Sequence, residues 1–364
     1  MENKKSRVLI ATSNPYIPQL MGGSERSSHA IGKHLEREGY EIDVICGLKP
    51  NDLIGFSNRI RRKLFKIRFP RDQVEGLSIY RTWPDSGSIA HHIREFIRFR
   101  KPDIALVQAG HPFSMARELH EEGIPTIIFL RDLLFPEADG IPPTSNKIKY
   151  IANSKYTAEQ FAKKYGIQTT EIIPPSINPN DYRVPRKGKY VLMINPVVEK
   201  GVDLTLELAR RLPNIPFVLQ EAWEIDDKTK NKINVAINQL DNIKLQPKCD
   251  DMKPVYSGAR VLIAPSQWEE AWGRVVSEAQ VSGIPVIASN TGGLPESVGP
   301  GGILLPPNDV ENWEAELRKI WDNNDYDENL SKLAQQHAER KEISHTFLLH
   351  KTQSLIENLI TKAR

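Results

Sequence analysis

Short apolar runs alternate with amphipathic stretches along the whole chain. The runs at 7–12, 41–46, 104–107 and 126–130 are nearly continuous, which is typical of strands buried on both faces of a parallel sheet. Between the first two runs, Ala30, Ile31 and Leu35 recur at helical spacing. This order of strand, helix and strand predicts an α/β protein built from βαβ units.

A second series of the same pattern begins near residue 190. Strands are predicted at 190–194, 216–219, 243–245, 261–264, 285–288 and 303–305, and late helices at 313–321, 330–340 and 344–360. Between the two series, residues 172–186 hold four prolines and no periodicity, which predicts an interdomain linker. A chain of 364 residues is also too long for one ordinary core. We therefore expect two doubly wound domains, at 1–182 and 183–344.

Residues 265–296 (PSQWEEAWGRVVSEAQVSGIPVIASNTGGLPE) combine a predicted strand end, a loop and a helix start. Gly273 has no Cβ, so a ligand can approach its backbone closely. The N–H groups of Arg274 and Val275 begin the helix and are predicted to bind phosphate oxygens. Glu278 lies about 6 Å further along the helix, which suits a ribose hydroxyl. Glu270, before the helix, would face the group beyond the phosphates. Neither carboxylate is expected in a core.

This stretch resembles the E-x7-E signature of glycosyltransferase family 4, the retaining nucleotide-sugar transferases. The matching positions are Pro265, Ser266, Glu270, Gly273, Glu278, Ala279, Gly283, Pro285, Val286, Gly292, Gly293 and Glu296. The resemblance implies the GT-B architecture, in which two Rossmann-like domains face each other across a cleft. It also implies that the C-terminal helix, 345–364, packs back onto the first domain.

The resemblance extends to other strand ends. Gly22 and Gly23 occupy the place of a loop whose backbone faces the donor diphosphate and sugar, and Lys200 matches a lysine that pairs with the distal phosphate. Asn195 stands where the family usually has an arginine, and it offers a hydrogen bond without charge.

Two further candidates follow strands of the first domain. His111 matches a histidine of the family, although a loop histidine is as often structural. Arg131 replaces a histidine that the family uses near the reacting sugar, and an arginine there would stabilise a leaving diphosphate.

The implied function is transfer of a sugar from a nucleotide diphosphate sugar to an acceptor hydroxyl with retention of configuration. Family frequency favours a UDP-sugar over GDP-mannose, with a saccharide or lipid-linked acceptor in polysaccharide or glycolipid synthesis. The mechanism implied needs no metal and no cofactor. Two alternatives stay open: a catalytically weak GT-B binding or partner subunit, and a GT-B nucleotide-sugar epimerase. A dehydrogenase is disfavoured because no G-x-G-x-x-G follows the first strand.

Composition adds a location and a further partner. Cys46 and Cys249 form no disulfide framework and are expected to be small buried side chains, which with the absence of a signal or membrane segment predicts a cytoplasmic protein. Residues 1–180 carry a net charge of +6 and the remainder −3. Within the basic half, residues 58–71 hold seven Lys and Arg, no acid, and interleaved apolar residues. These residues are either an interfacial segment that contacts anionic lipid, or a solvated basic loop. In the first case the protein would bind peripherally at the inner face of the membrane.

Two weaker signals concern a nucleic-acid partner and a metal site. Nucleic acid is not expected as a partner, because no recognised nucleic-acid module surrounds the basic stretch. Asp325 and Asp327 form an acidic D-x-D pair, which we interpret as solvated rather than as a metal site because it lies in a charged turn.

Overall fold

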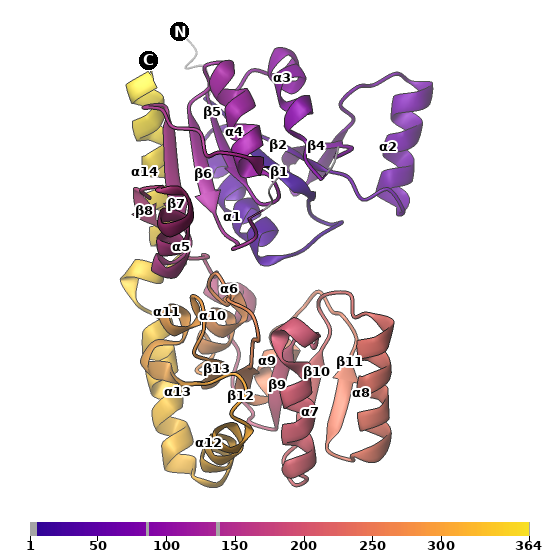
Figure 1. The fold of residues 1–364 in the computed structure, drawn as a ribbon, viewed down its shortest axis with the longest axis vertical. Coiled ribbons are helices and arrows are strands. Elements are labelled where there is room, and N and C mark those ends of the chain that lie inside the picture. Colours follow the sequence, from indigo (N-terminus) through magenta and orange to yellow (C-terminus); the bar gives the residue numbers. More distant parts are fainter. Residues whose placement is uncertain (1–5, 85–86, 136–138, 364) are drawn as a thin grey trace. The chain divides into compact units, whose positions relative to one another are not determined.

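The computed structural model describes residues 6–84, 87–135 and 139–363, which form two compact units (Figure 1). The first unit comprises the chain up to Ser176 together with residues from Thr346 onward, and the second comprises Ile177–His345. The chain leaves the first unit at Ser176, ahead of the boundary expected after residue 182. Tyr182 is buried in the second unit, and its ring lies 6.0 Å from that of Tyr256.

The first unit is built on an eight-stranded sheet with the order β3-β4-β2-β1-β5-β6-β7-β8. Its strands run parallel except that β3 is antiparallel to β4. They are β1 (Arg7–Pro15), β2 (Glu41–Gly47), β3 (Arg71–Val74), β4 (Leu77–Thr82), β5 (Ile104–Gln108), β6 (Thr126–Leu130), β7 (Ile148–Ala152) and β8 (Glu171–Ile172). The helices of this unit are α1 (Gly23–Arg37), α2 (Leu53–Leu64), α3 (Ala90–Phe99), α4 (Pro112–Glu121), α5 (Lys155–Tyr165) and nearly all of α14 (His345–Ala363).

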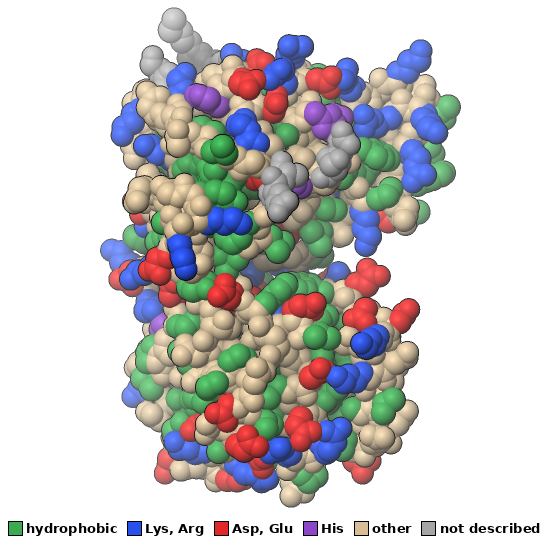
Figure 2. Space-filling model, viewed as in Figure 1, with side chains coloured by type: hydrophobic (Ala, Val, Ile, Leu, Met, Phe, Trp, Pro, Cys, Tyr) green, Lys and Arg blue, Asp and Glu red, His purple; other side chains and the backbone are tan. Residues whose placement is uncertain are grey.

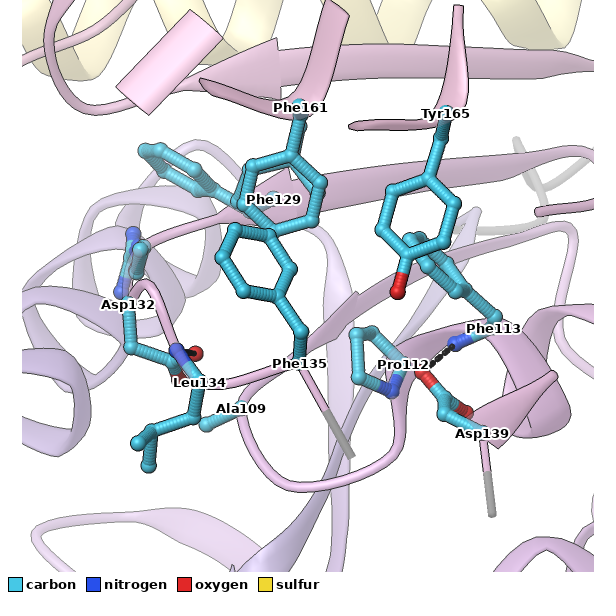
Figure 3. Close-up of a pocket in the computed structure, with 12 residues that line it drawn as sticks. Ala109, Pro112, Phe113, Phe129, Asp132, Leu134, Phe135, Asp139, Phe161 and Tyr165 are labelled. Carbon is cyan, nitrogen blue, oxygen red and sulfur yellow. Dashed lines mark hydrogen bonds between the residues drawn. The ribbon is translucent and has the colours of Figure 1, made fainter. Parts of the chain in front are cut away.

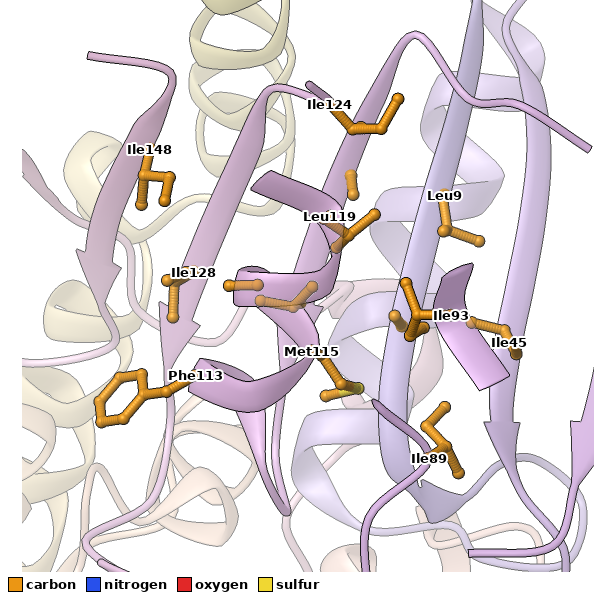
Figure 4. Close-up of a cluster of buried hydrophobic side chains, with 14 of the residues drawn as sticks. Leu9, Ile45, Ile89, Ile93, Phe113, Met115, Leu119, Ile124, Ile128 and Ile148 are labelled. Carbon is orange, nitrogen blue, oxygen red and sulfur yellow. The ribbon is translucent and has the colours of Figure 1, made fainter. Parts of the chain in front are cut away.

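Both faces of this sheet are buried, which explains the unbroken apolar runs. Along β1, Leu9 belongs to the core that contains Ile93 of α3 and Met115 of α4 (Figure 4). The neighbouring Ile10 points to the other face, whose core contains residues of α1 and α14, among them Leu35. Successive side chains of a strand point to opposite faces, so a strand covered on both sides is apolar at most positions. The C-terminal helix thus supplies one layer of the first unit.

The second unit has a six-stranded parallel sheet with the order β11-β10-β9-β12-β13-β14. The strands are β9 (Tyr190–Ile194), β10 (Phe217–Gln220), β11 (Ile243–Gln246), β12 (Ala259–Ala264), β13 (Val286–Ser289) and β14 (Gly302–Leu305). The helices are α6 (Pro179–Tyr182), α7 (Val202–Arg211), α8 (Asp227–Gln239), α9 (Lys253–Gly258), α10 (Arg274–Gln280), α11 (Leu294–Val298), α12 (Val310–Asp322) and α13 (Asn324–Ala338).

Each sheet has one place where the strand order reverses direction. In the first unit the chain moves outward from β1 to β2 and later returns to β5 on the other side of β1. In the second unit it moves from β9 to β10 and β11, then returns to β12 beside β9. Ligands of such sheets bind outside the carboxyl ends of the strands at this reversal, because the flanking loops diverge there. Ligands are therefore expected at the loops after β1 and β5 in the first unit and at those after β9 and β12 in the second.

The basic stretch 58–71 is neither a single segment nor a loop. Residues 58–64 complete α2, which starts at Leu53 after the N-cap Asp52, and Arg71 opens β3. Asn58 is buried, whereas most of residues 63–68 are exposed. Figure 1 places α2 beyond the β3–β4 end of the sheet.

The interpretation of the D-x-D pair as solvated is wrong for one of its members. Asp327 is only 4% exposed, and its carboxylate accepts two hydrogen bonds from Arg186, at 2.7 and 3.0 Å. This ion pair connects residues 172–186, the predicted linker, to α13. The expectation for cysteines holds for the buried Cys46 but not for Cys249, which is partly exposed; both thiols are free.

Candidate active site

Two sequence-predicted residues come together at the reversal point of the second unit. Lys200 follows β9 and Glu270 follows β12, and the Lys200 ammonium donates a hydrogen bond to Glu270 Oε1. The same oxygen accepts from the Ser266 hydroxyl at 2.6 Å. Both charged side chains keep about one-sixth of their surface exposed, at 15% and 16%. A cation and a carboxylate therefore share one solvent-accessible position at the carboxyl edge of the sheet.

Glycines allow the loops that carry this pair to pack closely. A Cβ on Gly201, next to Lys200, would lie 2.0 Å from the Pro265 carbonyl oxygen, and the φ of Gly201 is +84°. A Cβ on Gly292 would lie 2.4 Å from the Glu270 carbonyl oxygen, and Gly293 N–H donates to that oxygen at 2.6 Å. Only glycine combines these close approaches with positive φ. The glycine positions that matched the family signature thus hold the Glu270 loop between its neighbours.

The other predicted donor-site residues of this loop surround the start of α10. Gly273 is the N-cap residue with a φ of +86°, and a Cβ there would lie 2.4 Å from the side chain of Leu294. Arg274 and Val275 are the first two residues of α10, where backbone N–H groups lack partners within the helix. The side chain of Arg274 donates to Glu278 Oε1, one turn further along the helix, at 2.7 Å.

Glu278 is placed differently from its expected solvated position. It is 7% exposed, and its second oxygen, Oε2, accepts from the Tyr256 hydroxyl at 2.7 Å. Burial and the carboxylate beside it raise the pKa of Tyr256 well above its usual value, so this phenol remains a donor. Burial lowers the pKa of Arg274, but the nearby Glu278 more than offsets this, so the pKa of Arg274 is raised. Glu278 is therefore part of a buried hydrogen-bonded network, which the isolated carboxylate signal did not predict.

In the first unit, Gly22 and Gly23 lie where α1 begins after β1. Gly22 is the N-cap residue, and its φ of −74° is ordinary. A Cβ on Gly22 would lie 2.5 Å from Glu25 Oε2, the end of a side chain that would have to shift. Glu25 itself is buried, and burial raises the pKa of its carboxyl group. The sequence marks Glu25 only by its position: it is an acidic residue three positions after the N-cap glycine, in the first turn of the helix.

His111 follows β5, on the other side of the reversal point. Its Nδ1 lies 3.1 Å from the Gly87 carbonyl oxygen, and its backbone caps α4. The two residues before it, Ala109 and Gly110, have φ values of +47° and +70°. A left-handed alanine is uncommon outside strained turns. The turn brings Gly110 against the end of β1, where a Cβ would lie 2.7 Å from that of Ser13.

Arg131 is held beneath the glycine loop. Its guanidinium donates to the Ser24 carbonyl at 2.9 Å, the Ser28 hydroxyl at 2.9 Å and Gln108 Oε1 at 2.6 Å. It also lies 3.7 Å from the ring centroid of Phe129. These contacts join the ends of β5 and β6 to the start of α1. Arg131 thereby fixes the backbone next to Gly22 and Gly23.

The chain after Arg131 lines an aromatic pocket (Figure 3). Phe135 and Phe161 pack with their centroids 4.9 Å apart, beside Tyr165. Burial raises the pKa of Asp132 to about 6, with Glu25 and Asp139 adding to the shift. Asp139 accepts from the backbone N–H of Phe113 at 3.0 Å. Aromatic rings form much of the pocket wall. Among them, Phe135 packs on Phe161 and so fixes the chain that follows Arg131.

In the part of the chain that the structure describes, no group of three or more His, Cys, Asp or Glu side chains is arranged to hold a metal ion. Likewise, none of the described helices combines the length and apolar character that a bilayer crossing requires.

Comparison with known proteins agrees with this geometry. Residues 21–181 match the family described as Glycosyltransferase Family 4, and residues 176–337 match Glycosyl transferases group 1. A glycosyltransferase of Rickettsia africae has a TM-score of 0.77 and 16% identity, covering 98% of this chain and 99% of its own. Anabaena Alr3699/HepE, solved with UDP-glucose, has a TM-score of 0.75 and 15% identity over 96% of this chain and 99% of its own. These matches define a glycosyltransferase of the GT-B fold class.

The chain belongs to glycosyltransferase family 4. Among curated relatives, a D-inositol 3-phosphate glycosyltransferase of Streptomyces bingchenggensis is 26% identical over 53% of this chain. The sulfoquinovosyl transferase SQD2 of Arabidopsis thaliana is 33% identical over 39% of this chain. The matched regions span 49% of the Streptomyces relative and 28% of the Arabidopsis one. The resemblance to family 4 and the GT-B fold class inferred from the sequence are thus confirmed.

Proposed function

We propose that the protein transfers a sugar from a nucleotide diphosphate sugar to an acceptor hydroxyl with retention of configuration. The observation that carries this proposal is the pairing of Lys200 with Glu270 at the reversal point of the second sheet. One group suits a phosphate and the other suits sugar hydroxyls, so a diphosphate sugar would occupy both. The ion pair between them keeps both side chains ordered before the donor arrives.

In this proposal, charge stabilisation of the leaving diphosphate drives the reaction. Lys200 and the N–H groups of Arg274 and Val275 would receive the charge that develops as the bond to the sugar breaks. Glu270 would hold sugar hydroxyls, and Glu278 would act through the network around Arg274. Gly22, Gly23 and His111 are proposed to contact the reacting groups, with Arg131 supporting the glycine loop. No metal and no cofactor are assigned to any step.

A UDP-sugar is the favoured donor. Support comes from Anabaena HepE, which has been solved with UDP-glucose and with UDP and has the same fold. The acceptor would be a saccharide or lipid-linked alcohol on the cytoplasmic side, in polysaccharide or glycolipid synthesis. The Streptomyces relative is named for D-inositol 3-phosphate, which is compatible with a phosphorylated acceptor, and the Arabidopsis relative is named for the sulfoquinovosyl group.

Lys200→Ala should weaken binding of UDP by about 10- to 150-fold while changing uridine binding little. The reason is that the substitution removes a charge-assisted contact to phosphate worth about 1.5–3 kcal/mol. Calorimetric titration of both ligands measures the difference, after a thermal-shift panel of UDP, GDP and their sugars has identified the base. Lys232→Ala is the matched control, because Lys232 is paired with Asp203 on the surface of the same unit. Equal losses for UDP and uridine would remove Lys200 from the phosphate site.

The two alternatives differ in turnover. A catalytically weak partner subunit would bind the donor yet neither transfer nor hydrolyse a radiolabelled sugar. An epimerase would convert the donor without any acceptor. Release of UDP that depends on an added acceptor distinguishes transfer from both.

We also propose that the α2 region contacts an anionic membrane surface. Leu53, Phe56, Leu64 and Phe65 are between 60% and 87% exposed, and Phe99 of α3 is 58% exposed. Exposed cations interleave with them, and Figure 2 shows green and blue side chains gathered over this end of the first unit. Apolar side chains beside cations are typical of interfacial segments. The exposed set begins at Leu53 rather than at residue 58, so it is wider than the basic stretch alone.

Replacing Lys63 and Lys66 with Gln should weaken binding to vesicles of phosphatidylglycerol and phosphatidylcholine about thirtyfold. Each cation near such a surface contributes about 1 kcal/mol. Both lysines are exposed, whereas Arg61 is bonded to Asp72 and serves the fold. Vesicle sedimentation at low salt provides the measurement, with the exposed Lys228 and Lys230 of α8 replaced in the control. Parent protein that stays in solution would identify the α2 region as a solvated surface.

A further inference from the structure

Two tryptophans enclose the Lys200 ammonium. Trp223 follows β10 and Trp268 follows β12, the strands on either side of the strand that leads to Lys200. Lys200 Nζ lies 4.8 Å from the ring centroid of each indole. The two rings meet edge to face, with centroids 6.1 Å apart, and each tryptophan keeps 39% of its surface exposed. Large aromatic side chains with that exposure are costly to leave in water, so their position beside the ammonium calls for a role.

Asn195 holds the first of these tryptophans in place. Its Oδ1 accepts the backbone N–H of Trp223 at 2.8 Å, and its own N–H donates to the Gln220 carbonyl at 3.0 Å. Asn195 is buried and has a φ of +58°, a conformation that asparagine adopts more readily than most residues. The side-chain oxygen of Asn195 is thus bonded to the loop after β10. Asn195 lacks the positive charge of the arginine that the family usually has at this position, and its side chain instead supports the loop that carries Trp223.

We propose that Asn195, Trp223 and Trp268 form a cation clamp that positions Lys200 for the diphosphate of the donor. The inference rests on the proposed function, and it identifies Trp223 and Trp268 as positioning residues that act through Lys200. The negative faces of the two indoles attract the ammonium within the distance at which cation–π contacts form. The clamp compensates for an uncharged residue at 195 by presenting the one lysine in a fixed orientation.

The physical benefit is preorganisation. A lysine side chain has four rotatable bonds, and ordering it on binding costs conformational entropy. Contacts that already order Lys200 in the unbound protein remove that cost from the binding step. The clamp should therefore affect ligands that carry phosphate and leave nucleoside binding unchanged.

Trp223→Leu and Trp268→Leu should each weaken UDP binding about three- to tenfold, because each removes one ring from the ammonium. Trp→Phe at the same positions keeps a ring face and should restore most of the affinity. Uridine binding and the thermal unfolding midpoint should stay at parental values in all four variants. Asn195→Ala should reproduce the Trp223→Leu loss, and the double variant Asn195→Ala/Trp223→Leu should be no weaker than either single one, because both changes act on one contact.

Trp321→Leu is the matched control. The ring of Trp321, in α12, lies 5.5 Å from the guanidinium of Arg260, so the substitution removes a cation–π contact that does not involve Lys200. Parental UDP affinity in the Trp223 and Trp268 leucine variants would overturn the clamp and leave the proposed function intact. Equal losses of UDP and uridine would also overturn it, since the rings would then be a nucleoside surface. If neither UDP nor GDP binds the parent protein, the proposed function fails first and the clamp with it.

Discussion

Glu270→Gln is expected to lower kcat about a hundredfold while changing the KM for the donor little. In the proposed site this carboxylate contacts the sugar most strongly as positive charge develops on it, so its loss weakens the transition state more than the ground state. One preorganised polar contact of this kind contributes about 2.7–4 kcal/mol to catalysis. Gln keeps the size of the side chain and can still accept from Ser266. Initial rates of UDP release over a range of donor concentrations separate kcat from KM.

The neighbouring Glu269→Gln is the control for this experiment. Glu269 is exposed and precedes Glu270 in the same loop, so the substitution removes one negative charge from the same region of the surface. Its kcat should match that of the parent. The thermal unfolding midpoint of Glu270→Gln should also stay near the parental value, because Glu270 keeps contact with solvent. Parental turnover by a stable Glu270→Gln protein would contradict the assignment of Glu270 to the sugar.

Glu278→Gln should lower the free energy of unfolding by about 3–5 kcal/mol. The substitution removes the carboxylate charge of the buried Glu278 from beside the Arg274 guanidinium, whose side chain is only 15% exposed, and breaking a largely buried ion pair is strongly destabilising. The sequence alone favours the opposite result, a stable variant with a raised KM, because it presents Glu278 as a solvated ribose ligand. Urea unfolding followed by circular dichroism measures the loss.

Glu328→Gln, an exposed position of α13 in the same unit, should unfold like the parent. A double variant, Glu278→Leu with Arg274→Leu, removes both charges and should recover part of the stability lost in Glu278→Gln, because buried ion pairs are often replaceable by apolar residues. If Glu278→Gln is as stable as the parent and only its KM for the donor rises, the network of Glu278 with Arg274 and Tyr256 does not stabilise the fold. The assignment of Glu278 to the ribose would then be supported.

The carboxyl-edge loops could be located from the sequence because their signals are local. A continuous apolar run followed by a glycine and a helical period marks the end of a parallel strand, and such ends gather at one edge. Gly273 was recognisable because a glycine at the junction of a strand and a helix lets another group approach the backbone closely. The structure confirms the α/β class and the separate strand series on either side of the proline-rich region.

The contacts of Arg131 and Asn195, the two departures from the family pattern, could not be derived from the sequence. Each was interpreted as a ligand contact, because a sequence motif assigns a role to a position regardless of its neighbours. In the structure, Arg131 bonds to residues of α1 and β5, and Asn195 bonds to the loop after β10. These partners lie 23 to 107 positions away along the chain.

The sequence by itself determined the βαβ order, the two sheets and the loops that carry the candidate chemistry, since strand and helix periodicities are read from adjacent residues. Only the tertiary structure decided which polar groups pair. Lys200 meets Glu270 across 70 residues, and Tyr256 meets Glu278 across 22. Such pairs depend on strand order and helix packing, which place distant residues within hydrogen-bonding reach. Whether a carboxylate is a ligand or part of a buried ion pair depends on those neighbours, so the sequence located Glu278 while the fold set its surroundings.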